Sequence, residues 1–176
     1  MKSLQLSTLF SFFIIFGCST SDDIEPEEEL FDGNFELALT GDDSRNMVGM
    51  ASFVHGIITT KSEVENGSSL AIILTNKTNE DELISILVGQ IGDLDGINTG
   101  TYNINLEPDE GDPLVNVGAY LNGSITTFLG LSGKVTITKI QNDIVEGNIS
   151  VVLDNLNGNI IDMSGEFTAL GITEKI

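Results

Sequence analysis

From residue 32 onward, turn-forming residues recur about every ten positions, and the segments between them alternate apolar and polar side chains. Alternation with a period of two places successive side chains on opposite faces of a strand, whereas a helix needs apolar residues three and four positions apart. The segments are also rich in Val, Ile and Thr, which favour strands. This pattern restricts the chain to an all-β fold.

Ten segments carry the strand pattern. In the first, Phe35, Leu37 and Leu39 share one face. The third and fourth are almost continuously apolar, which predicts that both of their faces are covered. The ten segments are residues 34–40, 47–58, 68–75, 82–91, 100–106, 114–121, 124–130, 133–140, 145–153 and 160–170. Residues 76–86 are the one helix candidate, but a strand from Leu83 is favoured.

Short turns join most of these segments, so we expect mostly antiparallel neighbours in a meander. Asn-Gly pairs at 66–67, 122–123 and 157–158 favour tight hairpins, and residues 141–144 predict another. So many strands must hide their edges by closing into a barrel or by packing as two sheets. The expected fold is therefore an antiparallel sandwich or flattened barrel of about nine to ten strands.

The N-terminal residues have a different character. Lys2 precedes an apolar run that is shorter than the roughly 20 residues of a membrane-spanning helix and has the length of a secretory signal. The run ends at Cys18, the only cysteine of the chain, so no disulfide can form within it. Ile15-Phe16-Gly17-Cys18 resembles a bacterial lipobox, which implies cleavage before Cys18 and attachment of lipid to its thiol. A buried or reactive free thiol is the alternative.

A dense acidic block follows the cysteine, with six acids between residues 22 and 29. Like charges repel and keep such a segment extended, so residues 18–31 are interpreted as a lipidated cysteine and an acidic tether. Ser21-Asp22-Asp23 also resembles the export signal that sends Bacteroidota lipoproteins to the outer face of the outer membrane. The predicted organisation is a signal peptide over 1–17, the tether over 18–31 and one β domain over 32–176.

The charge of the chain limits its partners. Removal of residues 1–17 leaves 6 basic and 27 acidic residues, a formal net charge of −21. Nucleic acid requires cationic surface, so it is excluded as a partner. The expected contacts are the membrane through the N-terminal lipid, and a protein or glycan partner of unknown identity.

Four stretches of the C-terminal half resemble a group of uncharacterised Bacteroidota lipoproteins. They are GTYNI at 100–104, GKVTITKI at 133–140, IVEGNIS at 144–150 and SGEFTA at 164–169. The resemblance implies a small β domain on a lipid anchor. It brings no activity and no catalytic residues.

Residues suited to catalysis are scarce. His55, the only histidine, lies in an apolar segment, and no serine has the context of a nucleophile. With no tryptophan, an aromatic platform for sugars is also lacking. The acidic turns offer oxygen ligands for calcium, but their spacing does not fit an EF-hand, and solvated turns are the alternative. The calcium candidates are Asp93, Asp95, Asp109 and Asp112.

The sequence therefore predicts a lipid-anchored domain of the cell envelope, displayed at the surface of the outer membrane, that binds or scaffolds a partner without catalysis and without a cofactor. One alternative is a carrier that holds a small apolar ligand inside a closed barrel. Another is a hydrolase that uses paired carboxylates.

Overall fold

The computed structural model describes residues 33–59, 66–93, 95–105, 112–121 and 127–172. They belong to one unit, Phe31–Ile176, and within them the chain forms nine strands and no helix. The strands are β1 Asn34–Gly41, β2 Arg45–Thr59, β3 Asn66–Asn76, β4 Leu83–Ile91, β5 Gly100–Asn103, β6 Leu114–Tyr120, β7 Phe128–Gln141, β8 Ile144–Asn155 and β9 Ile160–Gly171. Over this part of the chain, no helix is long and apolar enough to cross a membrane.

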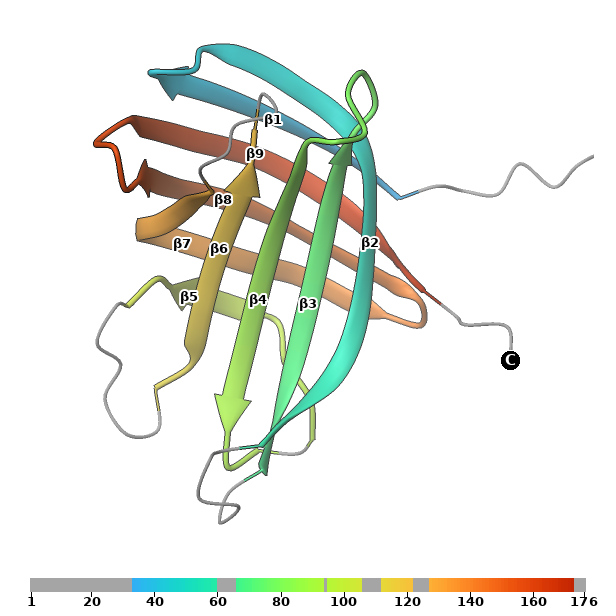
Figure 1. The fold of residues 1–176 in the computed structure, drawn as a ribbon. Helices are drawn as coiled ribbons and strands as arrows, with labels where there is room; N and C mark the ends of the chain where they lie inside the picture. Colours follow the sequence, from blue (N-terminus) through green and yellow to red (C-terminus); the bar gives the residue numbers. More distant parts are fainter. Residues whose placement is uncertain (1–32, 60–65, 94, 106–111, 122–126, 173–176) are drawn as a thin grey trace, which may run out of the picture. The chain divides into compact units, whose positions relative to one another are not determined.

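Eight of the strands close into an antiparallel barrel. The sheet runs in the order β5-β7-β6-β4-β3-β2-β1-β9-β8, and β8 pairs back to β7. In Figure 1, β3, β4 and β6 stand upright in front while β7, β8, β9 and β1 run sideways behind them. The sheet is continuous, so the sandwich alternative is wrong and the barrel alternative is confirmed.

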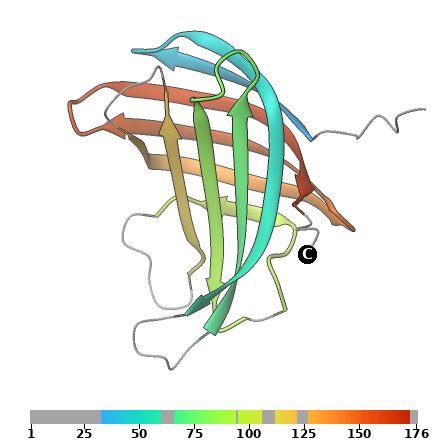
Figure 2. The ribbon, with the colours of Figure 1, turned by 45° about the vertical axis from the view of Figure 1, so that its right-hand side comes forward.

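Two long strands join the upright and the sideways parts. β2 pairs with β1 through residues 45–50 and then with β3 through residues 49–59, and its curve is plain in Figure 2. β7 pairs with β8 over most of its length, while its other edge meets β6 first and β5 later. A strand shared in this way can turn the corner of the barrel without leaving its backbone groups unpaired.

The seam between β6 and β7 is the weakest part of the closure. Only Gly118 with Leu129 and Ala119 with Phe128 pair across it. β5 lies outside the eight-stranded circuit and pairs with β7 further along. Beyond β5, the backbone amide of Ile104 donates to the carbonyl oxygen of Gly133 at 2.9 Å, and its side chain packs against the core. Ile104 thus fills space beside this seam.

The inward-facing positions form one apolar core. Among the residues that the structure describes, 29 hydrophobic ones are buried. The alternation that predicts the first and sixth segments is confirmed in β1 and β6. The largest side chains with less than 2% exposure are Leu37, Leu39, Met47, Leu70, Ile72, Leu74, Ile84, Ile86, Leu121, Ile137, Ile149 and Leu153. Their burial is the main driving force for folding.

Several local expectations differ from the structure. Residues 124–130 and 133–140 were expected as two strands, but Phe128–Gln141 is one strand with a register shift between Gly130 and Ser132 and a positive φ of 115° at Gly133. A glycine inside a strand often marks such a bulge and not a turn. The meander expectation fails at β5, because β4 pairs with β6.

The turn predictions have mixed outcomes. Asn66 and Gly67 lie in β3, paired with Thr59 and Ile58, and not in a turn. The hairpin at residues 141–144 is confirmed, since Gln141 pairs with Ile144 and Asn142 has a φ of 52°. The strand from Leu83 is also confirmed over the helix alternative.

A polar cluster closes one end of the barrel. Glu82, which is 1% exposed, accepts hydrogen bonds from Arg45 Nη1 at 3.0 Å and from Asn76 Nδ2 at 2.6 Å. Arg45 Nε also donates to Asp43 at 3.0 Å. Burial alone would lower the pKa of Arg45, but the hydrogen bonds and charges of Glu82 and Asp43 outweigh burial and raise it. Arg45 therefore stays cationic and compensates the buried carboxylate of Glu82.

We predict that Glu82→Ala lowers the free energy of unfolding by about 2–3 kcal/mol, because it leaves Arg45 Nη1 and Asn76 Nδ2 without this acceptor. Chemical denaturation measures the change. The control is Glu146→Ala, which breaks the ion pair with Lys139. The side chain of Glu146 is 37% exposed and that of Lys139 is 43% exposed. Exposed pairs contribute little, so its loss is expected below about 1 kcal/mol. Equal losses in the two variants would contradict the role of burial.

Tyr102 fixes β5 to the barrel. Its side chain is 7% exposed, and its hydroxyl donates to the carbonyl oxygen of Asn98 at 2.6 Å. Burial raises the pKa of Tyr102 above its usual value of about 10, because the phenolate is poorly solvated there. Below pH about 10 both the folded and the unfolded states keep the proton, so the contribution to stability is complete.

Above pH about 10, the unfolded state loses this proton first, and we predict that stability falls as the pH rises through the folded-state pKa of Tyr102. Tyr102→Phe should remove this component of the alkaline slope, while costing about 1 kcal/mol at neutral pH through the lost hydrogen bond. Denaturation at a series of pH values measures both effects. The same alkaline slope in the two proteins would refute the assignment.

Candidate functional site

The residues predicted to carry the lipid and the export signal lie outside the described part of the chain. These are Cys18, Ser21, Asp22 and Asp23, and their roles remain predictions. Asp109, a calcium candidate, also lies outside it.

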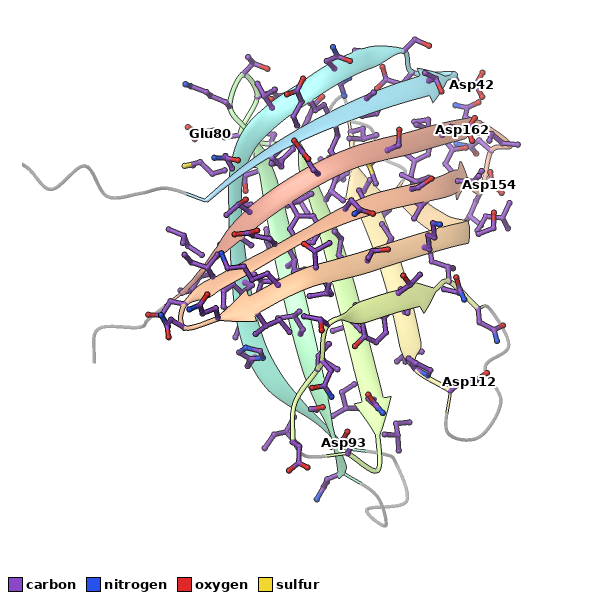
Figure 3. The ribbon with its side chains drawn as sticks, turned by 180° about the vertical axis from the view of Figure 1, so that it is seen from behind. Asp42, Glu80, Asp93, Asp112, Asp154 and Asp162 are labelled. Carbon is purple, nitrogen blue, oxygen red and sulfur yellow. The ribbon has the colours of Figure 1, made fainter. Side chains whose placement is uncertain are left out.

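The structure does not gather the other calcium candidates. Asp93 follows β4, and its Oδ1 accepts a hydrogen bond from the amide of Asp95 at 2.8 Å. Asp112 precedes β6 and lies at a separate corner of the barrel in Figure 3. Among the residues with described positions, no three His, Cys, Asp or Glu side chains come together as a metal site. His55 is exposed on β2, with its ring edge-on to Phe53 at a centroid distance of 5.2 Å.

A groove lies on the outer surface of β1, β9 and β8. One part of it has a volume of about 360 Å³ and a second part about 270 Å³, and both are lined by Asn148 and Glu166. We call the two parts together the outer groove. Its other polar side chains are Asn34, Glu36, Asn46, Thr138, Glu146, Ser164 and Thr168.

Two glycines that border the groove lie in close contact with neighbouring strands. A Cβ on Gly165 would overlap the backbone oxygen of Glu36 and press on Leu37, so β9 can approach β1 this closely only with glycine there. Gly147 on β8 leaves space that the ring of Phe167 fills, with its nearest carbon 2.6 Å from where a Cβ would stand. These contacts fix the backbone beneath the groove.

Two carboxylates face each other across the floor of the groove. Glu36 on β1 pairs in register with Glu166 on β9. Both are exposed, and neither has a hydrogen bond or ion pair with another described residue. Like charges directly opposite on neighbouring strands are destabilising. The stability of the fold therefore gives no reason for these two carboxylates to lie opposite each other.

Amide and hydroxyl groups surround the two carboxylates. Asn148 on β8 is opposite Glu166, and Thr136 on β7 is opposite Asn148. Ser164 lies two residues before Glu166 on the same face. The groove therefore offers acceptors with negative charge beside groups that both donate and accept hydrogen bonds. Such a surface suits a ligand that presents hydroxyl or cationic donors.

One ion pair lies at the border of the groove. Lys139 Nζ on β7 approaches Glu146 Oε1 on β8 at 2.6 Å. Glu146 is paired in this way, so its charge is balanced locally. Glu36 and Glu166 are left as the charged acceptors available to a partner within the described lining.

Sequence reasoning did not identify this site. The alternation of residues 34–40 places Glu36 outward, and that of residues 160–170 places Glu166 outward. Their meeting depends on the pairing of the first strand with the last, for which the sequence has no local signal.

No protein family, curated protein or solved structure matches this chain. The argument for a binding site therefore rests on the geometry of the outer groove.

We predict that Glu36→Gln raises the free energy of unfolding by about 0.5 kcal/mol at low salt, because it removes the repulsion from Glu166. The gain should shrink in 0.5 M NaCl, where exposed charges are screened over a few ångströms. The matched control is Asp162→Asn on the same face of β9, since Asp162 is opposite Thr40 and Val152 and no carboxylate. An equal gain in the control would mean that only net charge matters.

Proposed function

We propose that this chain is a lipid-anchored domain of the cell envelope, displayed at the cell surface, that binds a glycan or protein partner without catalysis. The outer groove is the proposed binding site. The anchor is Cys18, and the acidic tether over residues 19–31 keeps the barrel away from the membrane. The resemblance of four stretches of the sequence to uncharacterised Bacteroidota lipoproteins implies the same lipid-anchored location.

The observation that carries the proposal is that Glu36 and Glu166 lie opposite each other on the floor of the groove, with no ion pair to another described residue. Sequences that fold well avoid unfavourable local contacts such as opposed like charges. Where such a contact persists, a functional site is expected. A partner that places a cation or several hydroxyl donors between the two carboxylates removes the conflict. Strong charge-assisted hydrogen bonds would then hold it.

A test of the groove uses the full chain displayed on cells and an array of neutral and amino-sugar glycans together with basic peptides. We predict that the double variant Glu36→Gln, Glu166→Gln loses at least about tenfold in affinity for the ligand that the unmodified chain selects. The control variant Glu80→Gln, Asp81→Asn removes the same charge from the loop between β3 and β4 and should bind normally. Equal binding by both variants would refute the groove as the site.

The same cells test the location. Protease added to intact cells should degrade the protein, and an immunoblot of lysed cells shows that the protease is active. Protection until lysis would place the barrel in the periplasm. If the unmodified chain hydrolyses an array ligand and the Glu36→Gln variant does not, the groove is instead the active site of a hydrolase that uses carboxylates.

A carrier of a small apolar ligand is the second candidate. The narrow seam between β6 and β7, with Ile104 beside it, favours this role, since opening only two residue pairs would reach the interior. Against it stands the large number of bulky side chains that occupy the inward positions. An eight-stranded barrel of this kind has an interior just wide enough for its own side chains or for one small ligand.

A further inference from the structure

The barrel has one face without any charge. β3, β4 and β6 contain no Asp, Glu, Lys or Arg, and the only such residue of β2 is Arg45, which lies at its start and points to the buried Glu82. The whole chain carries a formal net charge of −20. An uncharged surface four strands wide is therefore unexpected in this protein.

Large apolar side chains are exposed on this face. Met50 is 50% exposed, Val54 44%, Leu83 40% and Ile73 38%, and Leu129 at the adjoining start of β7 is 49% exposed. The strand register places Ile73 between Ser52 of β2 and Ser85 of β4, and Ser85 is followed by Gly118 of β6 and then Leu129 of β7. Three of the five residues in this row are serine or glycine, so few large side chains protrude from it and another sheet can pack against it.

Acidic residues lie at both ends of the uncharged face. Glu80 lies in the loop beyond the ends of β3 and β4, and Asp93 lies at the opposite end of β4 (Figure 3). A centre depleted in charge and a polar rim are typical of protein–protein interfaces. The almost continuous apolar sequence of β3 and β4 predicts that both of their faces are covered. Ile58 lies over Gly89 at one end of the outer face, but Ile73 and Leu83 on the rest of it are exposed.

We infer that the outer face of β2, β3, β4 and β6 is the interface of a symmetric dimer with a second copy of this chain. Charge selects this occupant. On the opposite side of the barrel, Glu36, Asp162 and Glu166 would face like charges in any close pairing of two copies. The uncharged face is the described surface on which two such acidic molecules can meet without opposing carboxylates.

The size of the face suits a weak to moderate dimer. Four strands spaced about 4.8 Å apart and about 7 residues long, at about 3.3 Å per residue, form a face with a flat area of roughly 450 Å² on each copy. Protruding side chains add to this area. A pair therefore buries on the order of 1,000 Å² in total, which lies at the lower limit for a specific interface. Twofold symmetry makes the surface self-complementary, as the commonest dimers are.

Native mass spectrometry of the full chain, purified from membranes in detergent, tests the inference. We expect a dimer mass whose share grows with protein concentration. Ile73→Glu should raise the dimer dissociation constant at least about tenfold, because it would bury a carboxylate. Ser150→Glu on the outer face of β8 is the control and should leave the constant unchanged. A monomer at every concentration would overturn the inference, as would a stable complex on this face with a different protein.

Cysteine cross-linking in cells gives a second readout that does not depend on a disruptive variant. Ser85→Cys lies near the middle of the face, where two copies approach around the twofold axis, and should give a covalent dimer under mild oxidation. Ser150→Cys is equally a surface serine on a strand and should not. The unmodified chain measures any contribution from Cys18. Cross-linking of both variants to the same extent would overturn the inference.

Salt provides a signature that separates this interface from an ionic one. The attraction is apolar, while the repulsion between two acidic copies is electrostatic and screened by ions. The dissociation constant should therefore fall as NaCl is raised from 50 to 500 mM. A rise over the same range would show that charged contacts hold the dimer and would overturn the proposed face.

Discussion

The pairing of β1 with β9 is the constraint on which the rest of the structure depends. Eight consecutive residue pairs join these strands, from Asn34 with Thr168 to Gly41 with Ile161. Without them, both strands would present long unpaired edges, and the apolar core would be open along one side. The same register sets Glu36 opposite Glu166 and brings Gly165 against the backbone of Glu36. The outer groove is thus a direct product of the closure.

The charged residues of the barrel lie mostly on one side. The side built from β1, β9, β8 and β7 carries carboxylates and lysines, whereas the only Asp, Glu, Lys or Arg on β2, β3, β4 and β6 is Arg45, which bonds to the buried Glu82. Both sides cover the same apolar core, so folding alone does not require the difference. The two proposed contacts would account for it: one with a ligand rich in hydrogen-bond donors, the other with the uncharged sheet of a second copy.

Much of the fold could be predicted from local sequence, because alternation reports which side of a strand each residue faces. It correctly placed Phe35, Leu37 and Val117 in the core. It could not show that Gly133 lies inside a continuous strand, since glycine serves bulges and turns alike. The groove could not be predicted either, because Glu36 and Glu166 are 130 positions apart and meet only through the register of β1 with β9.

The closure also has a kinetic consequence. β1 has its full set of partners only after β9 has been synthesised, so the contact that completes the barrel is also among the most distant in the chain. Folds dominated by such distant pairings reach the native state slowly, since the entropy of closing the long loop must be lost first. Until the C-terminal strand is available, the nascent chain exposes apolar strands with open edges and depends on protection from aggregation.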